Sequence, residues 1–138
     1  MAGSLDRFVR AQASTWDAAL AELTAGAKHG HWIWFIFPQL AGLGLSSTAR
    51  HYAIEDLAEA RAYLAHPVLG PRLIEATRAL LAHREQRPEA ILGTIDAMKL
   101  RSSLTLFEAA GGDPLFGEAI DAFYEGERDG MTLALLRR

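Results

Sequence analysis

The chain has 138 residues, of which 50% are hydrophobic and 22% are charged, and this balance excludes an intrinsically disordered protein. Fourteen Lys and Arg residues against 17 Asp and Glu residues give a formal charge of -3, so no overall positive field attracts nucleic acid or an anionic membrane. The sequence contains no Cys, which excludes disulfides and thiolate metal sites, and its first residues lack a signal-peptide pattern, so we expect a cytoplasmic protein.

The first predicted helix runs from Ser4, which can cap it, to Gly26, which can end it. Its apolar positions recur at steps of three and four residues: Leu5, Phe8, Trp16, Ala19, Leu20 and Leu23. The next segment contains an unbroken apolar run, Trp32 to Phe37, which is too short to span a membrane and ends at Pro38. A strand there would have no partner strand in the sequence, so the run is predicted to be a buried helical turn or an irregular segment.

A loop is predicted over residues 42–47, and helical periodicity with Pro and Gly breaks predicts five further helices. They lie at Ile54–Ala65, Gly70–Arg84, Pro88–Gly93, Asp96–Ala110 and Asp113–Gly126. Asp96 is placed to cap one of them, and the apolar tail from Met131 to Leu136 is expected to pack back onto the domain. The sequence therefore predicts an all-α fold: a single compact multi-helix domain over residues 1–138, with about six helices joined by short Pro and Gly connections.

Unusual side chains are concentrated between Lys28 and Ser47. The candidates for ligand binding there are Lys28, Trp32, Trp34, Gln39 and Ser46, and His31 is a candidate general acid or base. Aromatic walls offer stacking area, a histidine can move a proton near neutral pH, and Gly with Ser hydroxyls can bring backbone N–H groups to an oxyanion. This set suits a flat, anionic ligand such as a nucleotide. The alternative is that the aromatic residues are simply core, with Lys28 and the histidines at its solvated rim.

A second candidate surface is predicted on the helix that begins at Asp96. Asp96 and Lys99 are three residues apart and share one helix face, which Ser102 and Ser103 continue. Asp96 is the second candidate general acid or base, and Lys28 or Lys99 is the candidate partner of an anionic group. Ser102 and Ser103 are candidate ligand-binding residues. The alternative is a helix cap, a solvated lysine and hydroxyls that bond back to the helix.

Metal binding has little support in the sequence. His29 and His31 are two residues apart, a spacing that on a strand points both side chains the same way, but no further His or carboxylate follows nearby to complete three or four ligands. Neither the P-loop pattern nor the dinucleotide-binding glycine pattern occurs. The sequence therefore predicts no metal and no cofactor.

Three longer patterns resemble a known family. They are Gly26-x-Lys28-x-x-His31-Trp32-x-Trp34-Phe35-Ile36-Phe37-Pro38-Gln39, Gly42-Leu43-Gly44-x-Ser46 and Asp96-x-x-Lys99-Leu100-x-Ser102-Ser103-x-Thr105-Leu106-Phe107. With these residues the chain is similar, over nearly all of its length, to the bacterial family called domain of unknown function 1810. The resemblance implies a bacterial protein with a helical single-domain fold. It implies no activity, because none is established for the family.

Two further resemblances of this family concern its function. Some members carry a calpastatin label, which we set aside because calpastatin-type inhibitors are disordered and highly charged, whereas this chain is half hydrophobic with three Trp residues. The layout also resembles, as an analogy of fold, the NADAR group of ADP-ribose-related glycohydrolases, which are small helical proteins built around Trp, Lys and carboxylate residues. One departure from the family pattern is Gly93-Thr94-Ile95-Asp96, where the family usually has Phe-Gly and a polar turn before the Asp.

The sequence and the resemblance together lead to two hypotheses. In the first hypothesis, two parts of the chain meet at a cleft: the segment around His31 and the helix face of Asp96, Lys99 and Ser102. The cleft binds a phosphorylated small molecule, or one that resembles a nucleotide or ADP-ribose. If the protein is an enzyme, it hydrolyses this ligand. In the second, the chain is a non-enzymatic module that engages a protein partner or a second copy of itself. Nucleic acid and membranes are not expected partners. Whether the chain is an enzyme, and its oligomeric state, stay open.

Overall fold

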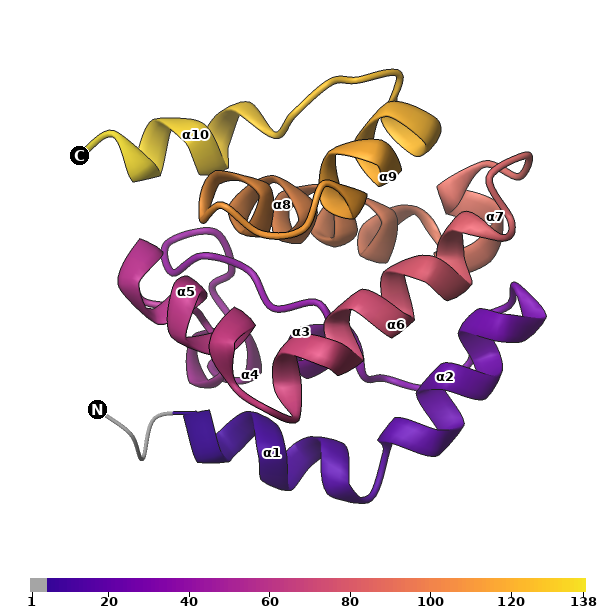
Figure 1. The fold of residues 1–138 in the computed structure, drawn as a ribbon, viewed down its shortest axis with the longest axis horizontal. Coiled ribbons are helices and arrows are strands. Elements are labelled where there is room, and N and C mark those ends of the chain that lie inside the picture. Colours follow the sequence, from indigo (N-terminus) through magenta and orange to yellow (C-terminus); the bar gives the residue numbers. More distant parts are fainter. Residues whose placement is uncertain (1–4) are drawn as a thin grey trace.

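The computed structural model describes residues 5–138, and ten helices make up most of this part of the chain (Figure 1). They are α1 (Asp6–Ala13), α2 (Trp16–Ala25), α3 (Ile33–Ile36), α4 (Ser47–His51), α5 (Leu57–Ala65), α6 (Leu69–Leu81), α7 (Pro88–Leu92), α8 (Thr94–Ala109), α9 (Leu115–Tyr124) and α10 (Gly130–Leu136). Within residues 5–138 there is no strand, and β pairing is limited to one bridge between Leu40 and Ile54. The predicted all-α fold is confirmed.

The predicted number of about six helices is wrong, and the first correction lies at the N-terminal end. Instead of one helix ending at Gly26, the chain forms α1 and α2, with a turn at Ser14 and Thr15 where the Thr15 N–H donates to the Gln12 carbonyl. The apolar period continues through this turn, so periodicity alone does not reveal the break. Gly26 ends α2 in the left-handed conformation, as predicted. The predicted cap Ser4 lies outside the described residues.

The other additional helices are short. The apolar run contains the single helical turn α3, which agrees with the prediction for that segment. Helix α4 has five residues, too few for a periodic signal, and α10 forms in the tail that was expected only to pack back. Asp96 does not cap α8 as predicted: Gly93, with φ +87°, occupies the N-cap position and Asp96 lies within the first turn.

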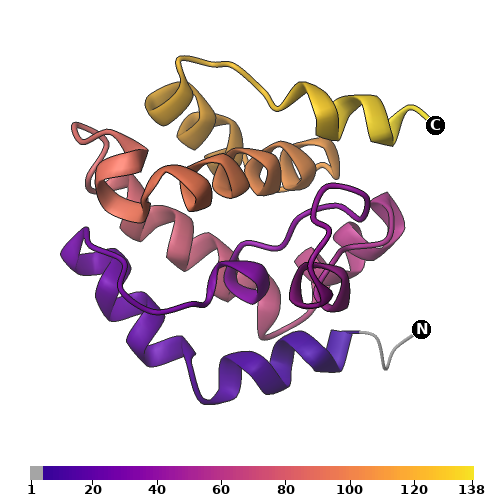
Figure 2. The same ribbon diagram turned by 180° about the vertical axis from the view of Figure 1, so that it is seen from behind.

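Helix α8 is the centre of the fold. It packs against α3, α5, α7, α9 and α10, and both ribbon views show it between the N-terminal helices and the C-terminal pair α9 and α10 (Figures 1 and 2). A row of buried aromatic rings crosses the molecule through it: Phe8 and Tyr63 lie 5.2 Å apart between ring centroids, Tyr63 and Phe107 5.3 Å, and Phe107 and Phe116 6.0 Å. These contacts join α1, α5, α8 and α9 in one core.

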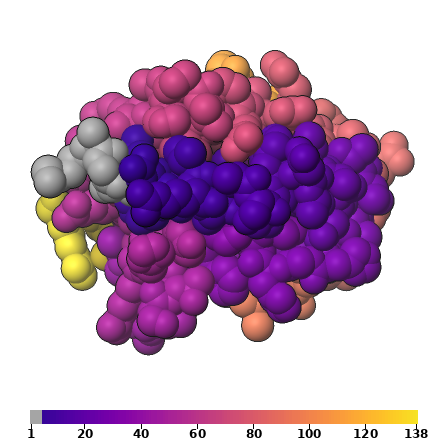
Figure 3. Space-filling model, turned by 90° about the horizontal axis from the view of Figure 1, so that it is seen from below, coloured from indigo at the N-terminus to yellow at the C-terminus, as the bar shows by residue number. Residues whose placement is uncertain are grey.

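The segment between α2 and α4 lies against α8 and is fixed at several points (Figure 2). The Lys28 N–H donates to the Ile91 carbonyl at 2.9 Å, and the Ile54 N–H donates to the Gln39 carbonyl at 2.8 Å. The buried side chain of Gln12 donates to the Phe35 carbonyl at 2.7 Å. Seen from below, α1 covers this side of the molecule, with α4 to α6 on its flanks (Figure 3). The part of the segment around α3 is therefore held between α1 and α8, whereas most residues from Ala41 to Ser46 are exposed.

No helix within residues 5–138 combines the length and the apolar composition needed to cross a membrane.

Candidate functional site

The two segments that the sequence singled out meet at a partly buried ion pair. Lys28 Nζ lies 2.7 Å from Asp96 Oδ2, and the two side chains are 7% and 18% exposed. Lys99 Nζ lies 3.9 Å from the other oxygen of the same carboxylate. Asp96 thus lies between two lysines and links the segment before α3 to the first turn of α8.

The two tryptophans of the apolar run lie against these lysines. The Lys28 ammonium is 4.9 Å from a Trp32 ring centroid, and the Lys99 ammonium is 4.8 Å from a Trp34 ring centroid. Both contacts have cation–π geometry, which favours the charged lysines where water is partly excluded. Trp32 is only 1% exposed and belongs to the core, whereas Trp34 is half-buried. Trp34 is therefore the tryptophan that a ligand can reach.

Glu22 of α2 shapes the turn that carries Lys28. Its Oε1 accepts hydrogen bonds from the backbone N–H groups of His29 and Gly30, at 2.7 and 2.9 Å, and from Trp32 Nε1 at 2.9 Å. Burial opposes the charge on Glu22, but these three donors outweigh it and lower the pKa of the carboxyl. The Lys28 ammonium also donates to the Gly30 carbonyl within the same turn. Sequence analysis did not select Glu22, because nothing in α2 indicates that its side chain reaches forward along the chain.

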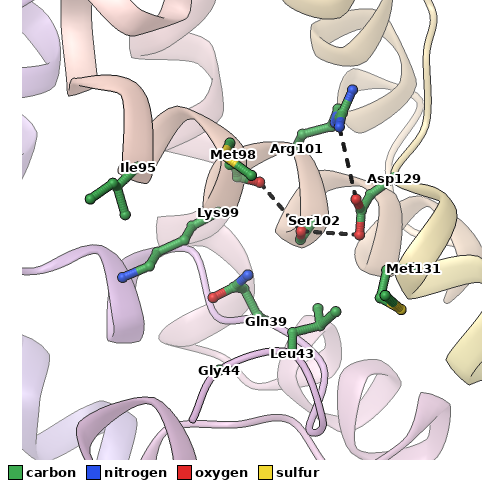
Figure 4. A pocket seen from close by; sticks show the side chains of 10 residues that line it. All are labelled: Gln39, Leu43, Gly44, Ile95, Met98, Lys99, Arg101, Ser102, Asp129 and Met131. Carbon is green, nitrogen blue, oxygen red and sulfur yellow. Dashed lines mark hydrogen bonds and ion pairs between the residues drawn. The ribbon is translucent and has the colours of Figure 1, made fainter. Parts of the chain in front are cut away.

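A cavity of about 280 Å³ opens beside Lys99 (Figure 4). Three structural elements line it: Ile95, Met98, Lys99, Arg101 and Ser102 from α8; Gln39, Leu43 and Gly44 from the loop after α3; and Asp129 and Met131 from the start of α10. Lys99 and Ile95 lie at one end and Asp129 and Met131 at the other, with the Gln39 amide facing α8 between them (Figure 4). The predicted residues Gln39, Lys99 and Ser102 therefore share one hollow.

The polar groups at the Asp129 end of the cavity are occupied. Asp129 Oδ2 accepts hydrogen bonds from the Ser102 hydroxyl at 3.1 Å and from the hydroxyl and N–H of Thr132 at 2.6 and 3.0 Å. The Arg101 guanidinium lies 4.0 Å from Asp129 and 3.6 Å from Glu127. Asp129 therefore caps α10 and joins it to α8, and this end of the cavity is braced from within.

The polar groups at the Lys99 end are not occupied. Among the described residues, the Lys99 ammonium and the Gln39 side-chain amide have no hydrogen-bond partner. An ammonium has three donors, and Lys99 uses its charge only toward Asp96, at a distance beyond hydrogen bonding, and toward the Trp34 ring. At this end of the cavity, Lys99 and Gln39 are the side chains with polar groups free to bind a ligand.

A family model described as "Protein of unknown function (DUF1810)" matches residues 2–136. The chain belongs to the DUF1810 family. A crystal structure of the conserved hypothetical protein Rv1873 from Mycobacterium tuberculosis is 46% identical, with a TM-score of 0.95 over 97% of this chain and 96% of that one. No curated protein matches the chain. The family resemblance is confirmed, and these comparisons supply no activity.

Two predicted ligand-binding serines of this DUF1810 protein lie outside the cavity. The Ser46 hydroxyl accepts from the Ala49 N–H at 3.0 Å and caps α4. Ser103 is fully buried, and its hydroxyl has no hydrogen-bond partner within the described residues. The alternative prediction for α8 was that its hydroxyls bond back to the helix. This is what the hydroxyls of Ser102 and Thr105 do, because each donates to a backbone carbonyl one turn earlier.

His31 of the DUF1810 protein lies in a second hollow, of about 560 Å³. Its wall includes Trp34, the ring against which Lys99 lies, so the two hollows are neighbours. No contact joins His31 to Asp96 in the described part of the chain. The two candidate acid–base residues are thus in different surroundings: Asp96 in an ion pair and His31 exposed at the rim of the second hollow.

The rim of the first cavity carries exposed apolar side chains that sequence analysis did not select. Ile95, Met98 and Met131 line it and are 70%, 63% and 61% exposed, and Leu45, beside the lining residue Gly44, is 77% exposed. Their helical spacing is unremarkable, so only the three-dimensional structure brings them together. Asp129 carried a usable signal, since an Asp three residues before Thr132 matches a helix N-cap.

Within residues 5–138, no group of three or more His, Cys, Asp or Glu side chains is arranged to hold a metal ion.

Proposed function

We propose that this DUF1810 protein binds a small molecule that carries a phosphoryl group, and that Lys99 is the main contact of that group. The observation that carries the proposal is the Lys99 ammonium, which stands at the cavity with three donors and no hydrogen-bond acceptor among the described residues. Phosphoryl oxygens are strong acceptors for such a donor. Nucleotides and ADP-ribose derivatives belong to this class of ligand.

The rest of the cavity supports a ligand with a polar head and a less polar body. The Gln39 amide offers two further donors beside Lys99, and the cavity volume of about 280 Å³ suits a compact ligand. The side chains of Leu43, Met98 and Met131 supply apolar surface. Methionine side chains adapt to ligands of irregular shape because they are unbranched and polarizable.

The geometry supports binding better than hydrolysis. A general base must come within about 3 Å of the proton that it removes. Asp96 instead makes a 2.7 Å contact with Lys28 and does not line the cavity, while His31 lines the neighbouring hollow. Catalytic roles for Asp96 and His31 therefore stay predictions, whereas the ligand-binding role of Lys99 and Gln39 needs no rearrangement of the fold.

Isothermal titration calorimetry with ribose 5-phosphate tests the proposal. In Lys99→Met, which removes the ammonium and keeps an unbranched side chain only one atom shorter, affinity is expected to fall about 10- to 100-fold, the equivalent of one or two hydrogen bonds to a charged group. Arg78→Met is the matched control, because it removes one exposed positive charge from α6, away from the cavity. Absence of binding to the natural protein, or equal binding to Lys99→Met, contradicts the proposal.

The exposed apolar rim favours a second candidate, self-association. Ile95, Met98 and Met131 form an exposed apolar border of the cavity, of a kind that protein interfaces often cover. If two copies join there, light scattering is expected to give twice the mass of 15.1 kDa, and Met98→Lys is expected to restore the monomer. If the protein stays monomeric at high concentration, self-association is contradicted.

A further inference from the structure

The second hollow has an aromatic floor and no formal charge in its lining. Trp34, Phe35 and Tyr52 supply the rings, and no Asp, Glu, Lys or Arg is among its described lining residues. The rings are fixed by packing: Tyr52 lies 5.2 Å from Phe35, 5.9 Å from Phe8 and 4.6 Å from His51 between ring centroids. A fixed aromatic floor without charge suits a flat, uncharged group.

The polar groups around this floor have no internal partners. Within residues 5–138, the side chains of His31 and His51 and the hydroxyls of Ser47, Thr48 and Tyr52 make no hydrogen bond to the chain. The indole Nε1 of Trp34 is shielded from solvent and also lacks a partner. A purely apolar ligand would cover these donors and acceptors without pairing them, which costs free energy. The lining therefore favours a flat ring that carries its own donors and acceptors.

The hollow also lies next to the proposed anion site. Trp34 belongs to its wall, and the Lys99 ammonium lies 4.8 Å from the centroid of the same indole ring. The Trp34 indole is therefore shared between the second hollow and the Lys99 ammonium. Neither hollow by itself provides both kinds of contact, because no cation lines the second one and no aromatic residue lines the first.

We propose that the second hollow binds the heteroaromatic base of a nucleoside phosphate whose phosphate lies at Lys99. The base stacks on the floor of Trp34 and Tyr52, and its ring nitrogens and exocyclic groups pair with the histidines and hydroxyls at the rim. This assignment rests on the proposed function for its phosphate half. It narrows the ligand class from phosphorylated small molecules in general to nucleoside phosphates.

Calorimetry with three probes separates the two halves: adenosine carries only the base and sugar, ribose 5-phosphate carries only the sugar and phosphate, and adenosine monophosphate carries both. Adenosine is expected to bind the natural protein, and Tyr52→Phe and Thr48→Val, which each remove one hydroxyl and keep the shape, are each expected to weaken it about 2- to 10-fold. Lys99→Met is expected to weaken ribose 5-phosphate and adenosine monophosphate by a larger factor than it weakens adenosine. Adenosine monophosphate is expected to bind at least about 10-fold tighter than either fragment.

Each other outcome has a defined meaning. If ribose 5-phosphate binds and adenosine does not, the base site is wrong and the proposed function stands. If adenosine binds and ribose 5-phosphate does not, the proposed function fails, and the assignment of nucleoside phosphates fails with it. Unchanged adenosine binding in both hydroxyl variants places the base elsewhere and overturns the inference. The inference is also overturned if ribose competes as well as adenosine does, because the hollow then binds the sugar and not the base.

Discussion

Replacing Asp96 with Ala is expected to lower the free energy of unfolding by about 2–4 kcal/mol, because the ion pair is partly buried and its loss costs an amount between those for exposed and for fully buried pairs. The Lys28 side chain is 7% exposed, and its ammonium lies 2.7 Å from the Asp96 carboxylate. In the variant this ammonium keeps the Gly30 carbonyl and the Trp32 ring beside it, neither of which carries a full negative charge. Urea unfolding followed by circular dichroism measures the loss.

The double variant Lys28→Met/Asp96→Leu is the control for this result. It removes both charges and keeps similar side-chain volume, so it is expected to be more stable than Asp96→Ala. If Asp96→Ala costs less than about 1 kcal/mol, or if the double variant is the less stable of the two, the ion pair does not hold the two segments together as described.

Replacing Glu22 with Ala is expected to cost about 2–3 kcal/mol at pH 7, because two backbone N–H groups and the Trp32 indole lose the acceptor that they share. The same change releases the turn that carries Lys28, so the affinity for ribose 5-phosphate is also expected to fall. This fall is expected to be smaller than the one in Lys99→Met. Urea unfolding and calorimetry on the same samples measure both effects. Equal unfolding free energies for the variant and the natural protein would show that Glu22 does not brace the turn.

The lowered pKa of Glu22 gives this contribution a pH dependence. A carboxyl whose pKa is lower in the folded state stabilises the protein above its unfolded value, near 4.5, and loses this contribution as the pH falls through the folded pKa. Glu22→Gln removes the titration, so its stability is expected to decline less than that of the natural protein between pH 7 and pH 3. Glu75→Gln, which makes the same change at an exposed site on α6, is the control.

The positions of the longer helices could be predicted from the sequence, because their apolar period and their Pro and Gly breaks are local signals. The turn at Ser14 was missed because the apolar period runs through it, and α4 was missed because five residues carry no period. The sequence predicts Asp96 as the cap of the helix that follows it, but Asp96 lies within the first turn of α8 and its carboxylate pairs with Lys28, a residue distant in the chain. Tertiary contacts thus overrode the local signal.

The candidate site was predicted in part. Lys28, Asp96, Lys99 and Trp34 do lie together, as the hypothesis of converging segments requires. The sequence did not reveal that Trp34 and Gln39 line different hollows, since side chains on the same short segment point in different directions. It also did not reveal the contribution of α10, because Met131 reaches the cavity only once the C-terminal tail folds back onto α8.

The most direct test of the proposed ligand site is a titration of the isotope-labelled protein with ribose 5-phosphate, followed by backbone amide NMR spectra. Progressive shifts are expected at Gly44, Lys99 and Ser102, which line the cavity, and these shifts are expected to be lost in Lys99→Met. Spectra that do not change, or that change only on helices away from the cavity such as α6, would contradict the proposed site.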